Sequence, residues 1–219
     1  MIIKQKPFVV AITGASGAIY GLRFVRAITE LGKSVALTIS DAARIVMREE
    51  LGIEIEDLKN PVFLGQLFDP AACAKISYFH HQDLTAPIAS GSYPHQGMVV
   101  IPSSTTSFSR IANGISESLI ERAAECTIKE GRRLVIVPRE MPLSALHLEH
   151  LLKLARVGVR VVPAMPAFYA GAQNIEDLVD FVIGKVLDQL DVEHTLYKRW
   201  TGSVLQLKEK GAKWPENWL

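Results

Sequence analysis

Short runs of consecutive hydrophobic residues alternate along this chain with longer segments in which hydrophobic residues recur every three or four positions. The continuous runs are typical of buried strands and cover residues 8–13, 34–39, 98–101, 134–137 and 159–162, with a shorter one near 76–79. The helical spacing predicts helices over residues 19–31, 41–51, 116–130 and 145–157, and a last long helix from Asn174. Strands that alternate with helices and are hydrophobic throughout indicate a parallel sheet covered on both faces.

The fold class that this pattern favours is a single doubly wound α/β domain, Rossmann-like or flavodoxin-like, with a mainly parallel sheet. We assign residues 1–200 to this domain and residues 201–219 to a C-terminal tail. Residues 53–97 are harder to interpret, because the short strand is followed there by a loop rich in Ser, Gly, Pro and His. Ligands bind beyond the carboxyl ends of the strands in open α/β sheets, so functional residues are expected in the segments that follow the strands.

The composition narrows the choice of function. Of the 219 residues, 48% are hydrophobic and 21% are charged, which excludes a disordered chain and favours a self-associating protein. The net charge of +1 gives no support for a nucleic-acid or membrane-surface binder. Cys73 and Cys126 cannot build a disulfide framework, and the hydrophobic run near the N-terminus is too short to span a membrane. We therefore expect a cytoplasmic protein with reduced thiols.

The turn after the first strand is rich in small residues. Gly14, Ala15 and Ser16 let a ligand approach the backbone, and the helix N-terminus behind them attracts anions. The glycine spacing differs from the dinucleotide fingerprint, and Ser40 stands where a nicotinamide-binding protein needs an acidic residue. The turn alone does not choose between nucleotides and flavins, and the alternative is a tight strand–helix connection without a ligand.

A cluster of hydroxyl residues, Ser103 to Ser107, follows the strand at 98–101. Their side chains and backbone N–H groups could surround one phosphate, whereas the alternative is a polar loop with helix caps. Two anion-binding segments without an acidic ribose reader favour a mononucleotide such as FMN over NAD.

Four charged residues are further candidates. Arg139 could meet a cofactor anion and Glu140 could move protons near the reacting atoms, unless the two form structural salt bridges. Arg122 and Lys129 share one face of a predicted helix, where cations usually face solvent, but a phosphate-bearing substrate would give them a role.

Metal and hydrolase chemistry find no support in the sequence. His147 and His150 are three residues apart on a predicted helix, but no third ligand is evident, so no metal site is expected. No HExxH segment and no Ser–His–Asp order is present.

Together these residues resemble the UbiX-type flavin prenyltransferases, which belong to the superfamily of flavin-containing cysteine decarboxylases. The resemblance covers about residues 8–200 and rests on separate segments in the family's order and spacing: 13–21, 87–92, 102–107, 119–124, 137–140, 147–149 and 176–181.

The resemblance implies an enzyme that uses reduced FMN as co-substrate and dimethylallyl monophosphate as prenyl donor, without a metal ion. In this family the dimethylallyl group is joined to N5 and C6 of the flavin. The prenylated FMN then serves a UbiD-type decarboxylase, in ubiquinone biosynthesis or in aromatic-acid breakdown. The resemblance also implies a homododecamer with active sites at subunit junctions, in agreement with the low fraction of charged residues.

The resemblance further assigns roles to individual residues. The catalytic residues would be Ser16, Glu50 and Glu140. FMN would be bound by Gly14, Ala15, Ser16, Ser40, Ser104, Thr105, Thr106, Ser107 and Arg139. The substrate would be bound by Ser90, Arg122, Lys129, Tyr169 and Lys185, with Trp200 as an aromatic lid residue.

Three features of the sequence depart from the family pattern. Thr106 stands where relatives commonly have glycine, and Glu117-Ser118 replace an asparagine pair. Lys185 stands where the family has an arginine on the substrate phosphate, and lysine offers a point charge in place of a planar fork. Two other functions stay open: a flavin-dependent decarboxylase of an aromatic or cysteine-type acid, and a non-enzymatic flavin carrier. Neither needs the second phosphate pocket that the cations imply.

Overall fold

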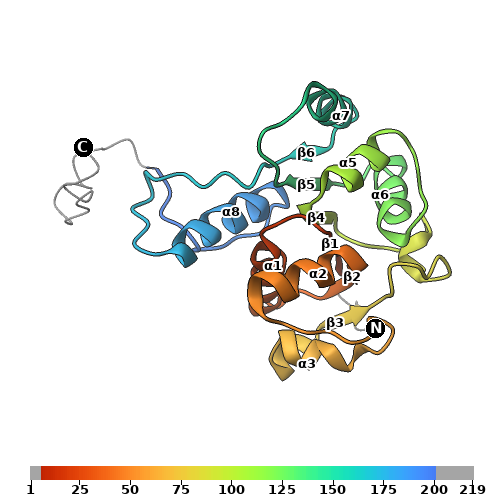
Figure 1. The fold of residues 1–219 in the computed structure, drawn as a ribbon, viewed down its shortest axis with the longest axis horizontal. Coiled ribbons are helices and arrows are strands. Elements are labelled where there is room, and N and C mark those ends of the chain that lie inside the picture. The colour runs from red at the N-terminus through yellow and green to blue at the C-terminus, as the bar shows by residue number, and fades with distance from the viewer. Residues whose placement is uncertain (1–5, 201–219) are drawn as a thin grey trace.

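The structure, a computed structural model, describes residues 6–200 and contains a six-stranded sheet at its centre (Figure 1). All strand pairs are parallel, and the order β3-β2-β1-β4-β5-β6 is that of a doubly wound Rossmann-like sheet. The strands are β1 (Phe8–Ile12), β2 (Val35–Ile39), β3 (Ile76–Tyr78), β4 (Met98–Ser103), β5 (Leu134–Pro138) and β6 (Arg160–Val161). The chain reverses its direction of travel across the sheet between β1 and β4, so a ligand crevice is expected at the carboxyl ends of these two strands.

Helices cover both faces of the sheet, as the sequence predicts (Figure 1). They are α1 (Ala18–Glu30), α2 (Asp41–Leu51), α3 (Leu64–Leu67), α4 (Pro70–Cys73), α5 (Thr105–Ala112), α6 (Leu119–Lys129), α7 (Ala145–Arg156) and α8 (Ile175–Gln189). Short 3₁₀ helices lie at Pro61–Phe63 and Pro87–Ala89. Buried residues of α1, α2 and α8 pack on one face of the sheet, and those of α5, α6 and α7 pack on the other.

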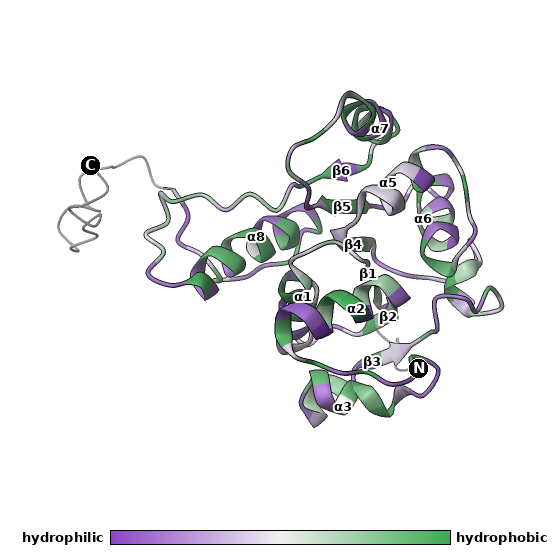
Figure 2. Cartoon of the chain, in the orientation of Figure 1, coloured by the Kyte–Doolittle hydropathy of each residue, from purple (hydrophilic) through white to green (hydrophobic). Residues whose placement is uncertain are grey.

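The central strands are buried on both faces because their residues alternate between the two hydrophobic clusters. In β1, Val10 and Ile12 belong to the cluster under α1, whereas Val9 and Ala11 belong to the one under α6. Figure 2 shows the contrast between the hydrophobic central strands β4 and β5 and the more polar edge strands β3 and β6. This burial explains why the central strands are continuous hydrophobic runs in the sequence.

Two close contacts hold the crevice between β1 and β4 together. The Thr13 hydroxyl donates to the carbonyl of Pro102 (2.8 Å) and accepts the backbone N–H of Ser104 (2.8 Å), which joins the two strand ends. A side chain at Gly21 would place its Cβ 2.6 Å from the carbonyl oxygen of Ile101, so only glycine lets α1 lie this close to β4.

The structure differs from the predicted elements in two regions. Residues 105–112, to which the sequence analysis assigned no helix, form α5, because Ser104 caps it and Phe108 and Ile111 bury one side of it. Residues 61–73 form α3, α4 and a 3₁₀ turn, which are too short for a helical repeat to show in the sequence. No helix within residues 6–200 is both long and hydrophobic enough to span a membrane.

Candidate active site

The turn after β1 and the loop after β5 meet above the end of β4. The Nε of Arg139 donates to the carbonyl oxygen of Ser16 (3.0 Å), and the backbone N–H of Arg139 donates to the carbonyl of Ser103 (3.4 Å). Arg139 therefore holds the turn of residues 14–17 against the strand-end hydroxyl cluster. These contacts bring together residues that the sequence placed in three separate segments.

Glu50, at the end of α2, caps the N-terminus of α1. Its Oε2 accepts the backbone N–H of Gly17 (2.8 Å) and that of Ala18 (3.1 Å). Partial burial raises the pKa of Glu50, but hydrogen bonds from the Ser16 side chain and these N–H groups, together with the charge of Arg139, outweigh it and lower the pKa overall. The expectation that this helix N-terminus attracts a ligand anion is therefore corrected, because a carboxylate of the protein already lies there.

The N-terminus of α5 is a second helix N-terminus at this edge of the sheet. The Ser104 hydroxyl accepts the N–H of Ser107 (3.2 Å) as the helix cap, and the two hydroxyl groups lie 3.0 Å apart. Thr105 and Thr106 form the first turn of the helix. The first N–H groups of a helix lack partners within it, and here they lie beside several hydroxyl groups.

Ser40 and Glu140 flank this region. The Ser40 hydroxyl accepts the N–H of Ala43 (3.1 Å) as the predicted cap of α2 and can still donate its own hydrogen. Glu140 follows Arg139 beyond β5, is half-buried, and accepts the N–H of Met141 at 2.9 Å. Arg139 and Glu140 thus bind different partners.

Ser90, Arg122 and Lys129 form a second group, between α6 and the 3₁₀ helix before it. The Nε of Arg122 donates to the carbonyl of Ala89 (3.1 Å), and a side chain at Gly91 would place its Cβ 2.7 Å from the Nζ of Lys129. Both cations have carboxylate partners that the sequence analysis missed. Arg122 pairs with Glu125 (3.0 Å) and Lys129 with Glu130 (2.7 Å).

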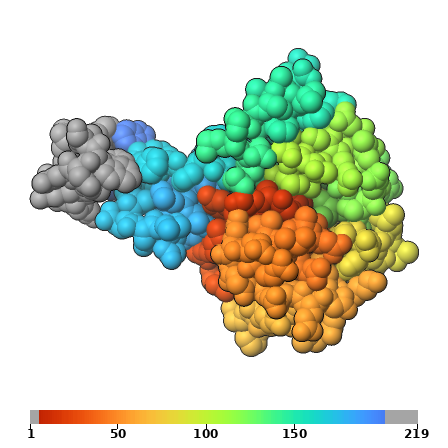
Figure 3. All heavy atoms as spheres, viewed as in Figure 1, coloured from red at the N-terminus to blue at the C-terminus, as the bar shows by residue number. Residues whose placement is uncertain are grey.

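Tyr169, Lys185 and Trp200 form a third group, on and around α8. The ring of Tyr169 packs edge-on against those of Phe181 (5.6 Å between centroids) and Trp200 (5.7 Å). The Nζ of Lys185 lies 3.7 Å from a carboxylate oxygen of Asp188. Part of the segment that carries this group, coloured blue in Figure 3, extends to one side of the domain.

The second and third groups lie on opposite faces of the sheet, since α6 covers one face and α8 the other. Arg122 and Lys185 therefore belong to helices on opposite sides of the sheet. The strand-end residues, by contrast, come together within the chain.

Other candidates are accounted for by local structure. His147 belongs to the capping box of α7 with Ser144, and His150 is hydrogen-bonded to Ser109 (2.8 Å). No cluster of three or more potential metal ligands is found among residues 6–200.

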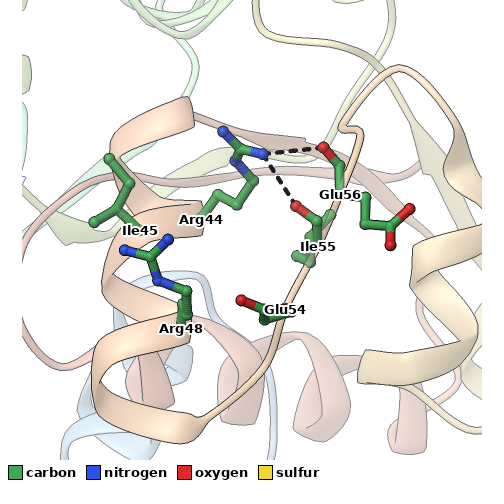
Figure 4. A pocket seen from close by; sticks show the side chains of 6 residues that line it. All are labelled: Arg44, Ile45, Arg48, Glu54, Ile55 and Glu56. Atoms are coloured by element: carbon green, nitrogen blue, oxygen red, sulfur yellow. Dashed lines mark hydrogen bonds between the residues drawn. The ribbon is translucent and has the colours of Figure 1, made fainter.

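A cavity of about 170 Å³ lies between α2 and residues 54–56 and is lined by Arg44, Arg48 and Glu54 (Figure 4). None of the predicted site residues lines this cavity.

Thr13 lies in the first candidate segment of the sequence, but the sequence analysis gave its side chain no role. Its hydroxyl is buried and holds the ends of β1 and β4 together. The sequence does indicate a role for Thr13, because this hydroxyl residue ends an otherwise hydrophobic strand immediately before the glycine turn.

Known proteins resemble the whole of this architecture. A family model described as Flavoprotein matches residues 2–187. The flavin prenyltransferase UbiX of Halalkalibacterium halodurans is 48% identical over 200 residues, covering 91% of this chain and 96% of its own. The UbiX of Methanothermobacter thermautotrophicus is 45% identical, with 90% and 96% covered.

Solved structures agree with these relatives. AnUbiX (PadA1), in complex with FMN and dimethylallyl pyrophosphate, superposes with a TM-score of 0.81 at 35% identity and covers 91% of this chain and 100% of its own. A dodecameric FMN-dependent UbiX-like decarboxylase from Escherichia coli O157:H7 gives 0.78 at 37%, with 90% and 100% covered. The peptidyl-cysteine decarboxylase EpiD, at 14% identity and a TM-score of 0.56, shares only the fold. The chain therefore belongs to the UbiX family of flavin prenyltransferases, within the flavoproteins.

Proposed function

We propose that this protein is a flavin prenyltransferase that transfers a dimethylallyl group from its phosphate ester to reduced FMN. We base the proposal on one observation: two separate groups of residues are suited to bind a phosphate group. One is the N-terminus of α5 with its hydroxyl groups, and the other is the cation pair Arg122 and Lys129 beside Ser90. A flavin carrier needs the first of these groups of residues but not the second.

The strand-end residues fit FMN. The start of α5 offers N–H groups and hydroxyl groups from Ser104 to Ser107, and no carboxylate caps it, unlike α1. Arg139 donates to the carbonyl of Ser16 at the same edge of the sheet, beside the small residues Gly14 and Ala15. A side chain at Gly14 would place its Cβ 2.3 Å from that of Ala42, so this glycine lets the turn pack on the start of α2. When bound, reduced FMN supplies the nucleophilic atoms of the reaction, which we take to be N5 and C6.

The protein residues contribute charge and proton transfer. Phosphate leaves more readily when cations stabilise its developing charge, which is the role of Arg122, Lys129 and Lys185. Glu140 accepts or returns a proton at the flavin edge, because it lies beyond β5 beside Arg139. Glu50 remains ionised and holds the Ser16 turn in place.

The complete site requires a second copy of the chain. Because α6 and α8 lie on opposite faces of the sheet, we propose that Arg122 of one copy meets Lys185 and Tyr169 of another. Leu146, Leu148 and Leu152 on α7 are more than half exposed, which is typical of a face covered by association. The UbiX-like neighbour from E. coli is dodecameric, and we propose the same assembly here.

The decisive assay is anaerobic incubation of the protein with reduced FMN and dimethylallyl monophosphate, with the pyrophosphate in a parallel reaction because AnUbiX was crystallised with that ester. We expect a flavin adduct heavier by one five-carbon unit. Unchanged flavin with both esters would overturn the proposal.

A direct decarboxylase is the second candidate, because one neighbour carries the name phenylacrylic acid decarboxylase. Release of CO₂ from an aromatic acid by the purified protein with FMN, without a prenyl donor, would support this candidate. We expect no CO₂ release, but we expect the reaction product to activate a UbiD-type decarboxylase that lacks its cofactor.

The location and pathway of the reaction are part of the proposal. Cys73 and Cys126 are free thiols, in keeping with a reaction in the cytoplasm. Ubiquinone biosynthesis is one pathway that would use the prenylated flavin.

A further inference from the structure

The chain turns back after α8, and residues 190–200, the returning segment, lie along that helix. Gly184 lies in the middle of α8, where glycine weakens a helix. A side chain at this position would place its Cβ 2.5 Å from the ring of Tyr197 and 2.7 Å from that of His194. The glycine therefore allows the returning segment to pack directly on the helix backbone.

Asp188, one turn further along α8, is the polar anchor of this contact. Its carboxylate accepts hydrogen bonds from the Tyr197 hydroxyl (2.6 Å), from Arg199 (2.7 Å) and from the Nε2 of His194 (3.2 Å). Partial burial raises the pKa of Asp188, but the bonds from Arg199, Tyr197 and His194 outweigh it and lower the pKa to about 2. The carboxylate is therefore ionised at neutral pH and binds three residues of the returning segment.

The same contacts place the third group of site residues. The ring of Tyr197 lies 5.0 Å from Phe181, which in turn packs on Tyr169, and Tyr169 packs on Trp200. The aromatic side chains therefore form one continuous wall whose position depends on the returning segment.

Two cations lie beside this wall and share Asp188. The Nζ of Lys185 lies 3.7 Å from Oδ2 of the carboxylate, and the Lys185 side chain is 43% exposed. Arg199 binds Oδ1, and its side chain is 58% exposed. One carboxylate between two cations leaves a local excess of positive charge, which suits a phosphate group.

We propose that Asp188 is a positioning residue for the substrate site: it holds the returning segment on α8, so that Trp200 and Tyr169 form the wall and Lys185 and Arg199 face the phosphate of the prenyl donor. This inference rests on the proposed function. Arg199 then supplies the guanidinium that position 185 lacks in this chain.

Two substitutions release the returning segment in different ways. Asp188→Asn removes the charge but keeps the shape of the anchor. Gly184→Ala obstructs the contact sterically, while alanine is the better helix former, so α8 itself is not weakened. Gly65→Ala is the matched control, because a Cβ at this helical position meets nothing within 4 Å.

Three measurements on the full chain test the proposal: the KM for dimethylallyl monophosphate, the dissociation constant of FMN, and the rate of tryptic cleavage after Arg199. Cleavage requires Arg199 to leave Asp188 and does not depend on activity. We expect both variants to raise the KM by about tenfold or more, as for the loss of a charge-assisted contact, and to speed up cleavage. FMN binding should stay unchanged, and the Gly65→Ala variant should behave as wild type.

Faster cleavage with an unchanged KM would overturn the proposal, since the returning segment would then lie outside the substrate site. Unchanged cleavage in both variants would also overturn it, because Asp188 and Gly184 would not hold the segment. Failure of the proposed function is distinguishable, because it would appear in the wild-type protein as a lack of any prenylated flavin.

Discussion

Replacing Glu50 by glutamine tests whether a carboxylate holds the turn after β1. The carboxylate accepts the N–H groups of Gly17 and Ala18 at 2.8–3.1 Å, and Ser16 also donates to it. A bond to a charged acceptor contributes about 1.5–3 kcal/mol and a neutral one about 1 kcal/mol. Glutamine keeps an oxygen acceptor, so the variant loses only the charged part of each bond. Glu50 is exposed, and solvent screening reduces the net loss to about 1–2 kcal/mol.

Thermal unfolding followed by circular dichroism measures this loss. A domain of this size shifts its Tm by about 2–4 °C per kcal/mol, so the Glu50→Gln variant should melt about 2–8 °C lower at pH 7. Both proteins must be compared at one concentration, because association raises the Tm. Glu49→Gln is the matched control, since Glu49 pairs with Arg48 on the exposed surface and should contribute little.

The pH dependence provides the second arm of this test. The pKa of Glu50 is lowered in the folded protein, so its stabilising effect is present above the pKa of the unfolded chain and is lost as the pH falls through the lower folded value. The difference in Tm between wild type and the Glu50→Gln variant should therefore shrink towards pH 3. Equal melting at pH 7, or a difference that does not depend on pH, would refute the capping role of the charge.

Three further substitutions test the site. Glu140→Gln should leave FMN binding intact and lower kcat, because only the ionisable group is lost; a wild-type kcat would reject its role in proton transfer. Ser104→Ala with Thr105→Ala should weaken FMN retention on dialysis, since each hydroxyl bond to a charged phosphate contributes about 1.5–3 kcal/mol. A double variant that stays fully yellow would show that the phosphate binds elsewhere. Lys185→Ala should raise the KM for the prenyl donor without changing FMN binding, whereas Lys185→Arg should be tolerated; saturation curves equal to wild type would place this side chain outside the pocket.

The sheet and its helices were predictable because their signals are local and repeated. Strands buried on both faces must be hydrophobic throughout, so β1, β2, β4 and β5 were recognised within one or two residues. The predicted caps Ser40, Ser144 and Asn174 each accept a backbone N–H at the start of their helix. The helices α3 and α4 have four residues each and are stabilised by burial against the rest of the domain. Four residues are too few for the helical spacing of hydrophobic residues to be recognised in the sequence.

The site was predictable where topology alone brings residues together. Parallel strands end at one edge of a sheet, and this is sufficient to place Ser16, Ser104 and Arg139 near one another. The contact between Glu50 and the start of α1 was not predictable as a cap, because it depends on how the end of α2 packs. The candidate cations Arg122 and Lys185 lie on different faces because α6 and α8 cover different sides of the sheet, and the resemblance to a family does not say which side each helix takes.

In the assembly that we propose, Arg122 and Lys185 of different subunits contribute to one site, because their helices lie on opposite faces of the sheet. Subunits with Arg122→Ala would still offer an intact α8, and subunits with Lys185→Ala an intact α6. Neither variant alone would form a site with both cations. Co-expressed in equal amounts, they would assemble at random, and roughly a quarter of the sites would combine two intact halves. Two defective alleles would thereby complement each other within one oligomer, whereas two substitutions on the same helix would not.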